Sequence, residues 1–407
     1  MPYKLRHTFK MNKGGRKMEW NKAKERYKLA EETLFSKNVK ELPEFEGNVV
    51  RISDCYPGIW MEHSYDPLVL ATLYPEFSDV PKNQARIFFK HQREDGQLPA
   101  YFHYGTGTLN VGYRQIQECV SFGKICYEVY ELTKDKKFLK ESYAAFKKWD
   151  SWLCDARMTR GKGLIELFCE WDTGHDHALR LDGIPHACTD NFGREHAEVD
   201  FLPMLSPDMN AVFYGDRMAL YYMADALGKS DEAEIWRNKA KQVKEKMLEL
   251  LYNKEDEFFY DLDKNDKHRK FKTIMITNVF QEHVLTQDEF DVIYDRYFKS
   301  DKHFATPVPF PATSVSDPAW VQNRSGNSWN FYAEALVALR AERWMEHYGK
   351  QADYEKLLYK WVECYTESDL LFGQEFHPIT GKPSDCSPNY SSALLFFIRA
   401  MRKLGKV

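Results

Sequence analysis

The 407-residue sequence lacks long apolar runs and a strong net charge. Its longest strongly apolar run extends from Ala393 to Ile398, far short of the roughly 20 residues that a membrane-spanning helix needs. The formal net charge is −4, from 57 basic and 61 acidic residues, which gives no general attraction to nucleic acid or to an anionic membrane. The sequence therefore predicts neither a nucleic-acid partner nor a membrane partner.

Paired cysteine motifs and nucleotide motifs are also missing. Eight cysteines occur without a Cys-x-x-Cys pair or the Cys/His spacing of a zinc site, so we predict no metal site. No glycine-rich nucleotide fingerprint and no Gly-x-Ser-x-Gly turn is found, and we expect no cofactor. The first 20 residues are basic and lack the apolar segment of a secretory signal, which predicts a cytoplasmic protein with reduced thiols.

Aromatic residues, in contrast, are abundant. The chain contains 10 Trp, 24 Tyr and 27 Phe, or 15% of all residues. Aromatic faces pack on the apolar faces of sugar rings, and Trp and Tyr add a hydrogen-bonding group. A helical protein with a bulky core would show the same excess, so composition alone leaves both interpretations open.

Helical periodicity dominates the rest of the pattern. Apolar residues recur at helical spacing in 230–251 with charged residues opposite, whereas 114–134 is apolar around most of its circumference and should be enclosed. The pattern predicts twelve helices, at about 20–35, 63–75, 80–93, 114–134, 136–153, 205–228, 230–251, 275–285, 287–299, 328–348, 351–368 and 389–404.

The connections between these helices are alternately short and long. We therefore predict an all-α fold, a single (α/α)6 barrel with inner helices enclosed by outer ones, long loops at one end and at most a short β-hairpin, at 257–262. The predicted domains are a basic N-terminal arm, 1–19, and a catalytic barrel, 20–407. A superhelix of helix pairs is the alternative, but no fixed-period repeat supports it.

Carboxylates and tryptophans gather in the predicted long loops. Loop 168–183 carries Trp171, Asp172 and Asp176, and a carboxyl group near Trp and other carboxylates should have the raised pKa that a general acid requires. A solvated acidic loop is the simpler interpretation. Loop 369–386 carries Glu375 between aromatic residues. Only a closed barrel would bring Asp176 and Glu375 to one cavity, in the arrangement that glycoside hydrolysis uses.

The order of the motifs resembles glycoside hydrolase family 63 and its small bacterial relatives, the mannosylglycerate and glucosylglycerate hydrolases, over about 55–400. Gln92, Asp95, Gly96 and Pro99 match a Gln-x-x-Asp-Gly-x-x-Pro segment of that family. Asp172-Thr-Gly-His-Asp176 is similar to its Glu-Ser-Gly-x-Asp loop, and Arg324-Ser-Gly-Asn-Ser-Trp329 to its Trp-Arg-Gly-x-x-Trp segment. Glu375-Phe-His-Pro378-Ile-Thr-Gly381 is similar to its Glu-x-Tyr-x-Pro-x-x-Gly loop, with one residue fewer.

This resemblance implies an inverting α-glycosidase with Asp176 as general acid and Glu375 as general base, and Asp172 is expected to tune Asp176. The family's Trp-Asp-Ser sugar grip appears here as Trp60-Met-Glu62-His63-Ser64. The substrate-binding residues that we predict are Trp60, Glu62, His63, Gln115, Gln117, Trp171, Asp172, His177, Arg324, Asn327 and Trp329.

The predicted function is hydrolysis of a short α-linked glucoside or mannoside, such as a disaccharide or a glycosylglycerate. The partner is thus a small carbohydrate, and the oligomeric state stays open. Two alternatives are an isomerase similar to N-acylglucosamine 2-epimerase, with His177, His283 and His377 as acid and base candidates, and a sugar-binding barrel without catalysis.

Overall fold

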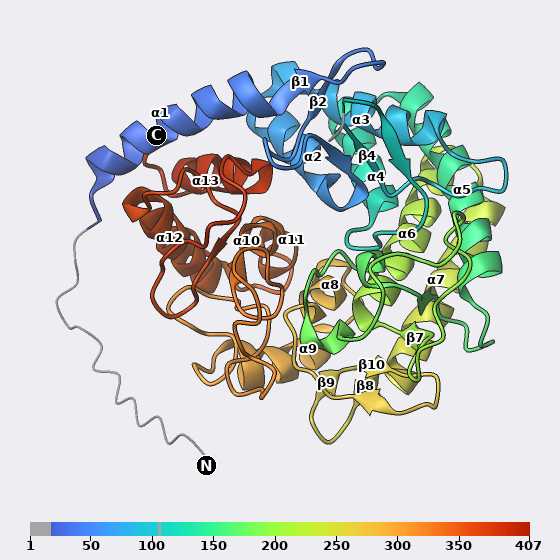
Figure 1. The fold of residues 1–407 in the computed structure, drawn as a ribbon. Coiled ribbons are helices and arrows are strands. Elements are labelled where there is room, and N and C mark those ends of the chain that lie inside the picture. Colours follow the sequence, from blue (N-terminus) through green and yellow to red (C-terminus); the bar gives the residue numbers. More distant parts are fainter. Residues whose placement is uncertain (1–17, 105–106) are drawn as a thin grey trace.

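The computed structural model describes residues 18–104 and 107–407, and the predicted arm at 1–19 lies almost wholly outside them. Within the described residues the helices are arranged in a ring (Figure 1). The predicted (α/α)6 barrel is confirmed.

An inner ring is formed by helices whose side chains are largely buried. These helices are α2 (Tyr65–Leu73), α4 (Phe122–Thr133), α6 (Pro207–Ala226), α8 (Ile276–Gln281), α10 (Ala335–Arg340) and α13 (Ser391–Lys403). Each of α2, α4 and α6 contacts the next inner helix. The short helix α11 (Glu342–Met345) contacts both α8 and α10, and α13 contacts α10 and α2, which closes the ring.

The outer ring is formed by amphipathic helices. They are α1 (Trp20–Thr33), α3 (Val80–Lys90), α5 (Lys136–Arg157), α7 (Ser230–Leu250), α9 (Gln287–Ile293) and α12 (Gln351–Glu367). On α7 the predicted stripe is buried, from Ala233 and Trp236 to Met247, because only that face meets the inner ring. Asp135 starts α5 by accepting hydrogen bonds from the backbone N–H groups of Lys137 and Phe138, both at 3.0 Å.

The beginning and the end of the described ring meet. Helix α1 packs against α12 and α13, and the C-terminus lies beside α1 (Figure 1). The Lys406 ammonium lies 4.4 Å from the centre of the Trp20 ring, and Arg26 donates to the backbone oxygen of Ser368 at 2.7 Å. The ring is therefore held shut by contacts between its first and last described helices.

Two predicted helices differ from expectation at their N-terminal side, and the helix expected over 275–285 already ends at Gln281. The helix expected from residue 114 begins at Phe122, because 113–121 is an irregular segment with Gln117 at a φ of +48°. The helix expected over 328–348 is divided into the strand β12 (Ala333–Glu334), α10 and α11. Both N-terminal differences occur where the chain enters an inner helix. In both places the non-helical residues line the cavity described below.

Short strands pair within the long loops, and they exceed the single hairpin expected. Residues 257–262 hold β9 (Phe258–Phe259), paired with β8 (Tyr252–Asn253), and β10 (Asp261–Leu262), paired with β11 (His268–Arg269) and β7 (Met204–Leu205). The other strands are β1 (Val39–Glu41), β2 (Asn48–Val50), β3 (Gly58–Trp60), β4 (Tyr101–His103), β5 (Asn110–Gly112), β6 (Glu166–Leu167) and β13 (Glu375–Phe376). Loops that are packed over a ring must satisfy their backbone groups, and strand pairing does so.

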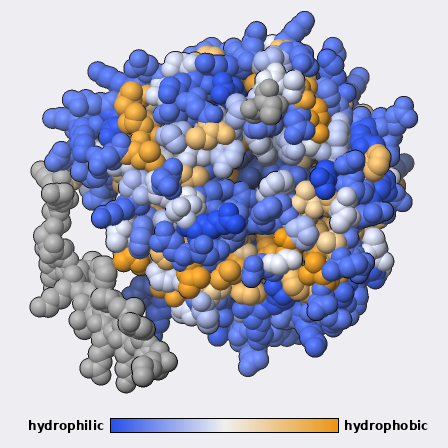
Figure 2. All heavy atoms as spheres, in the orientation of Figure 1, coloured by the Kyte–Doolittle hydropathy of each residue, from blue (hydrophilic) through white to orange (hydrophobic). Residues whose placement is uncertain are grey.

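The aromatic excess serves both core and loops. Trp149, Trp152, Trp344 and Trp361 are almost fully buried between the helices. The face drawn in Figure 2 is mostly hydrophilic, with apolar residues in separate small groups. No helix among the described residues is both long and apolar enough to cross a membrane.

Candidate active site

A cavity of about 340 Å³ is enclosed by the connections that precede the inner helices. Most of the predicted site residues line it. These are Trp60, Glu62, His63, Gln115, Gln117, Trp171, Asp176, Asn327 and Trp329. Residues far apart in the sequence thus meet in one cavity because the ring is closed.

Asp176 is the acidic group at the junction of two of these loops. Gly174, two residues earlier, has a φ of +66°, which turns the loop towards the cavity. The Asn327 amide donates to the Asp176 carboxylate at 2.5 Å. Burial raises the pKa of Asp176 to about 7, and the negative charge of Glu170 adds to this effect. Asp176 can therefore be protonated near neutral pH.

Glu62 is a second carboxyl group in the cavity wall. Burial raises its pKa to about 8, while the positive charge of Arg340 opposes the shift. Arg340 also donates to the backbone oxygen of Glu62 and, at 3.1 Å, to that of Cys119, which fixes the start of α2 against the next loop. With its proton in place, Glu62 can donate a hydrogen bond to a neutral ligand.

His63 lies beside Glu62 and is held by Tyr390. Its Nε2 atom and the Tyr390 hydroxyl are 2.6 Å apart. Burial and then the charge of Arg340 lower the pKa of His63 well below its usual value, so the ring is neutral.

Flat aromatic surfaces form the remaining walls. Trp60 stacks on Tyr101 with ring centres 5.6 Å apart, and Trp171 stacks on His186 at 5.1 Å. Trp329 packs against His175 at 4.8 Å. Trp60, Tyr101, Trp171 and Trp329 line the cavity, and aromatic rings of this kind can pack on the apolar faces of sugars.

Asp172 does not line the cavity, contrary to its predicted role in substrate binding. Both of its oxygen atoms accept hydrogen bonds from the Arg157 guanidinium, at 2.6 and 3.1 Å, and all of these groups are fully buried. The backbone N–H groups of Ile116 and Phe168 also donate to it. The neighbouring acidic group that raises the pKa of Asp176 is Glu170, because the charge of Asp172 is already balanced by Arg157.

His177 and Arg324 line a smaller side pocket instead of the main cavity. This pocket, of about 190 Å³, also includes Glu170 and His186. Glu170 accepts hydrogen bonds from the His186 ring and from the His177 backbone N–H group. Because His186 stacks on Trp171, the side pocket and the cavity lie on either side of that ring pair.

Glu375 lies behind the cavity wall, and its neighbour Gln374 lines the cavity. Successive residues of a strand point to opposite faces, and Glu375 is directly paired with Glu334 across β12 and β13. The Glu375 carboxylate accepts from the backbone N–H group of Ser328 at 3.2 Å and is fully buried. Counted back from Pro378 without a gap, the first position of the Glu-x-Tyr-x-Pro motif falls on Gln374. The expected pair of carboxylates facing one cavity is thus not observed.

Burial and the charge of Glu375 raise the pKa of Glu334 well above its usual value. Both effects favour the protonated form of Glu334. The two residues are paired across the strands β12 and β13 behind the wall.

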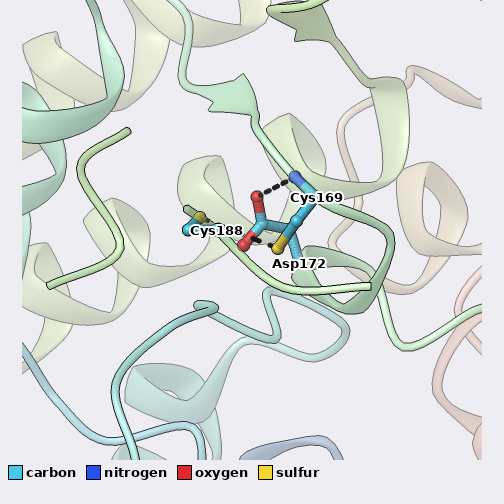
Figure 3. Close-up of side chains that lie close together, drawn as sticks. All are labelled: Cys169, Asp172 and Cys188. Carbon is cyan, nitrogen blue, oxygen red and sulfur yellow. Dashed lines mark hydrogen bonds between the residues drawn. The ribbon is translucent and has the colours of Figure 1, made fainter. Parts of the chain in front are cut away.

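Cys169, Asp172 and Cys188 form a buried cluster whose ligand atoms lie within 4.8 Å of one another (Figure 3). The two sulfur atoms are 3.8 Å apart. The Arg157 guanidinium, however, donates to Asp172 and lies 3.5 Å from the Cys188 sulfur. A positive side chain already occupies the place of a cation, so these residues do not fit a metal ion.

The histidines proposed for an isomerase have separate surroundings. His177 lines the side pocket, the His283 ring stacks on His347 at 3.6 Å, and His377 packs against Phe331. Of these three, none lines the cavity. The structure does not bring them together as an acid and base pair.

Several cavity residues were missed by the sequence analysis. They are Tyr56, Tyr101, His103, Asn110, Gln374 and Tyr390. Tyr101 and Asn110 lie in the long connection between the predicted helices 80–93 and 114–134. The length of this connection was the one feature of the sequence that could have indicated a role in the site. The pairing of β3, β4 and β5 that brings them next to Trp60 has no local signature.

Comparison with known proteins identifies related chains. The family model described as the mannosylglycerate hydrolase MGH1-like glycoside hydrolase domain matches residues 77–392. An uncharacterised protein from Borreliella burgdorferi is 24% identical over 250 residues, which are 60% of this chain and 47% of that protein. The chain thus spans about half the length of this curated relative.

Solved structures share the fold. A GH63 mannosylglycerate hydrolase from Thermus thermophilus in complex with glucose superposes with a TM-score of 0.72 at 15% identity, covering 91% of this chain and 99% of that chain. Neutral trehalase from Saccharomyces cerevisiae superposes with a TM-score of 0.67 at 12% identity, covering 90% of this chain and 76% of that chain.

Proposed function

The chain belongs to the MGH1-like glycoside hydrolase family, and from this premise we propose that it hydrolyses a short α-linked glucoside or mannoside with inversion at the anomeric carbon. A glycoside hydrolase acts on a carbohydrate, and the ring from residue 20 to 407 is proposed as the catalytic domain. The observation that carries the proposal is the position of Asp176, a buried carboxyl group with a pKa raised to about 7, in a cavity lined by three tryptophans.

Asp176 is proposed as the general acid. A protonated carboxyl group beside the glycosidic oxygen can donate its proton as the bond to the anomeric carbon breaks. Hydrogen bonds from the side chains of Asn327 and Trp171 hold the carboxyl group in the cavity wall. Trp60, Trp171 and Trp329 would pack on the sugar ring.

Glu375 was predicted as the base, and we now propose a positioning role for it. Its carboxylate holds the backbone N–H group of Ser328, between Asn327 and Trp329. Through this bond Glu375 would keep the partner of the acid and one aromatic wall in place. In the same loop, Gln374 is the residue that lines the cavity, and it would therefore be the one to contact the attacking nucleophile.

The lining suggests a neutral substrate. Among the described residues that line the cavity there is no Lys or Arg, while two carboxyl groups are present, Glu62 and Asp176. A negatively charged aglycone would lose its hydration without gaining a cationic partner. We therefore propose a neutral aglycone, such as a second sugar or a polyol, rather than a carboxylate.

The proposal is tested with a panel of alkyl α-glucosides, alkyl α-mannosides and α-linked disaccharides, followed by NMR of the anomeric proton. Inversion releases the β-anomer first. Asp176→Asn should lower kcat on alkyl glycosides by about 10²–10⁴-fold, the usual contribution of general acid catalysis. The effect should be smaller on 4-nitrophenyl glycosides, whose leaving group needs little protonation. The exposed Asp200 supplies the matched control, Asp200→Asn.

Two outcomes would refute this assignment. One is an Asp176→Asn protein that cleaves alkyl glycosides as fast as the unmodified protein. The other is release of the α-anomer first.

A second candidate is a sugar-binding barrel with little turnover. It is favoured by the amide of Gln374 in the cavity wall, where a carboxylate was expected. Calorimetric binding of a neutral sugar without product release would support it.

A further inference from the structure

The side chain of Gln374 is fixed in the cavity wall by hydrogen bonds at both ends of its amide. Its nitrogen donates to the Asn327 side-chain oxygen at 3.0 Å, and its oxygen accepts from the Cys386 thiol at 3.4 Å. Its backbone oxygen accepts from the N–H group of Ala335, the first residue of α10, at 2.9 Å. Gln374 is therefore a built part of the cavity and not a mobile side chain.

Gln374 is also linked to the proposed acid. Asn327 bonds to Asp176 through its nitrogen and to Gln374 through its oxygen. The two bonds and the amide between them keep the Asp176 oxygen and the Gln374 nitrogen at most about 8 Å apart, which is compatible with the roughly 6.5–9.5 Å between the two carboxyl groups of inverting glycosidases. A base in such an enzyme would be expected at about this place.

An amide in this place can hold a water molecule but cannot take a proton from it. Three other ionisable side chains at or behind the wall are poorly suited to replace the missing base, and His103 of the same wall is tested by substitution. Burial raises the pKa of Glu62 to about 8, so its carboxyl group keeps its proton near neutral pH. His63 is tied to Tyr390, and burial lowers its pKa well below the usual value. Glu375 is turned to the other face of β13, towards Glu334.

We propose that Gln374 determines the reaction of this site by placing an amide, which cannot take a proton from water, where an inverting glycosidase has its base. Hydrolysis is then slow, while attack by a nucleophile that has no proton to lose is not slowed. This inference rests on the proposed function of Asp176. In the slow reaction, water must attack the anomeric carbon before it loses a proton. An anionic nucleophile forms its bond to the anomeric carbon directly, the carbon–oxygen bond breaks, and the leaving oxygen takes the proton of Asp176.

The first experiment uses the unmodified protein and sodium azide as the probe. Azide at about 1 M should accelerate release of 4-nitrophenol from 4-nitrophenyl α-glucoside or α-mannoside. NMR of the product should show a β-glycosyl azide, because azide attacks from the face opposite to the leaving group. A role of Gln374 that is only structural would not produce this compound.

The second experiment supplies the missing base with Gln374→Glu. Because general base catalysis contributes about 10²–10⁴-fold, kcat for hydrolysis should rise at least about tenfold, and azide should no longer accelerate the reaction. Gln374→Asp, with a shorter side chain, should give a smaller gain. Gln351→Glu adds the same charge at the exposed start of α12 and should leave the rate unchanged. Circular dichroism establishes that each variant is folded.

The inference is overturned if Gln374→Glu hydrolyses no faster than the unmodified protein, including the case in which neither is active. It is also overturned if Glu375→Gln, Glu62→Gln or His103→Gln loses hydrolysis and recovers it with azide, because that side chain would then be the base. The proposed function fails separately, through Asp176→Asn. A fast unmodified enzyme that needs Asp176 would leave the glycosidase assignment intact and remove only the inference about Gln374.

Discussion

Replacing Asp172 by Asn should destabilise the protein strongly without changing the titration of the active site. The substitution leaves the Arg157 guanidinium fully buried and without its counter-charge. Breaking a buried ion pair by removing one partner costs about 3–5 kcal/mol. The Asn side chain can still accept one bond from Arg157, but its second side-chain group is a donor that faces the N–H groups of Phe168 and Cys169. The cost should therefore lie in the upper part of that range.

The size of the chain converts this energy into a melting temperature. At about 2.1 cal/mol/K per residue, unfolding of 407 residues carries an entropy of about 0.85 kcal/mol/K. A loss of 3–5 kcal/mol then lowers Tm by about 4–6 °C. Differential scanning calorimetry measures this shift directly, and the linear dependence of unfolding on urea gives an independent value.

A matched control is offered by Asp155, which pairs with Arg194 at 2.8 Å but has 72% of its side chain exposed. Surface ion pairs contribute little, so Asp155→Asn should shift Tm by no more than about 1 °C. An Asp172→Asn protein that melts with the control would refute the reasoning. A shifted alkaline limb of activity in Asp172→Asn would show instead that Asp172 tunes Asp176, as the sequence predicted.

Three further expectations follow from the site. Because the pKa of Asp176 is raised to about 7 and the acid must be protonated, kcat/KM on an alkyl α-glycoside should be constant below that pH and fall about tenfold per unit above it; a flat profile between pH 6 and 8 would contradict this. Gly174→Ala should lower both Tm and kcat, because φ at this position is +66° and the added Cβ would lie 2.8 Å from the Glu62 carboxylate. Gly228→Ala is the control in the same melting and rate assays: φ there is +72° and no atom lies within 4 Å of the added Cβ, so only the backbone cost should appear. In competition between α-glycosides with a glycerol and a glycerate aglycone, kcat/KM should be at least about tenfold higher for the neutral glycerol compound. This factor corresponds to about 1.4 kcal/mol, the cost of one missing charge pair. Equal rates would show that a cationic group outside the cavity wall binds the carboxylate.

The ring could be predicted from the sequence because its cause is local. The apolar stripe of 230–251 and the enclosed pattern of 205–228 follow from helical periodicity, and each gave a helix within a few residues of its observed bounds. Closure then follows, because alternating inner and outer helices can bury both kinds of surface only around a shared axis.

The base position could not be predicted in the same way. Gln374 and Glu375 are adjacent, and a two-residue strand decides which of them faces the cavity. A shift of one residue in a strand reverses every side chain, and nothing in such a short segment fixes the register. Glu375 was predicted as the base because a carboxylate has the right chemistry, but Gln374 is the residue that lines the cavity.

Asp172 and Glu170 show a second limit. Both belong to the same acidic turn, and the sequence favoured Asp172 as the partner of Asp176. Arg157, at the end of α5, balances the charge of Asp172, so Glu170 is the neighbour whose charge acts on the acid. That contact crosses from an outer helix to a loop, and spacing along the chain does not reveal it.

The contact between Trp20 and Lys406 places the start of α1 next to the segment that follows α13. A short linker could join these two segments, and new termini could be opened at the turn around Gly228, between α6 and α7. That turn follows the C-terminal end of an inner helix, whereas the cavity lies at the N-terminal ends. A circularly permuted enzyme of this design would carry a fused partner protein on the side remote from its substrate.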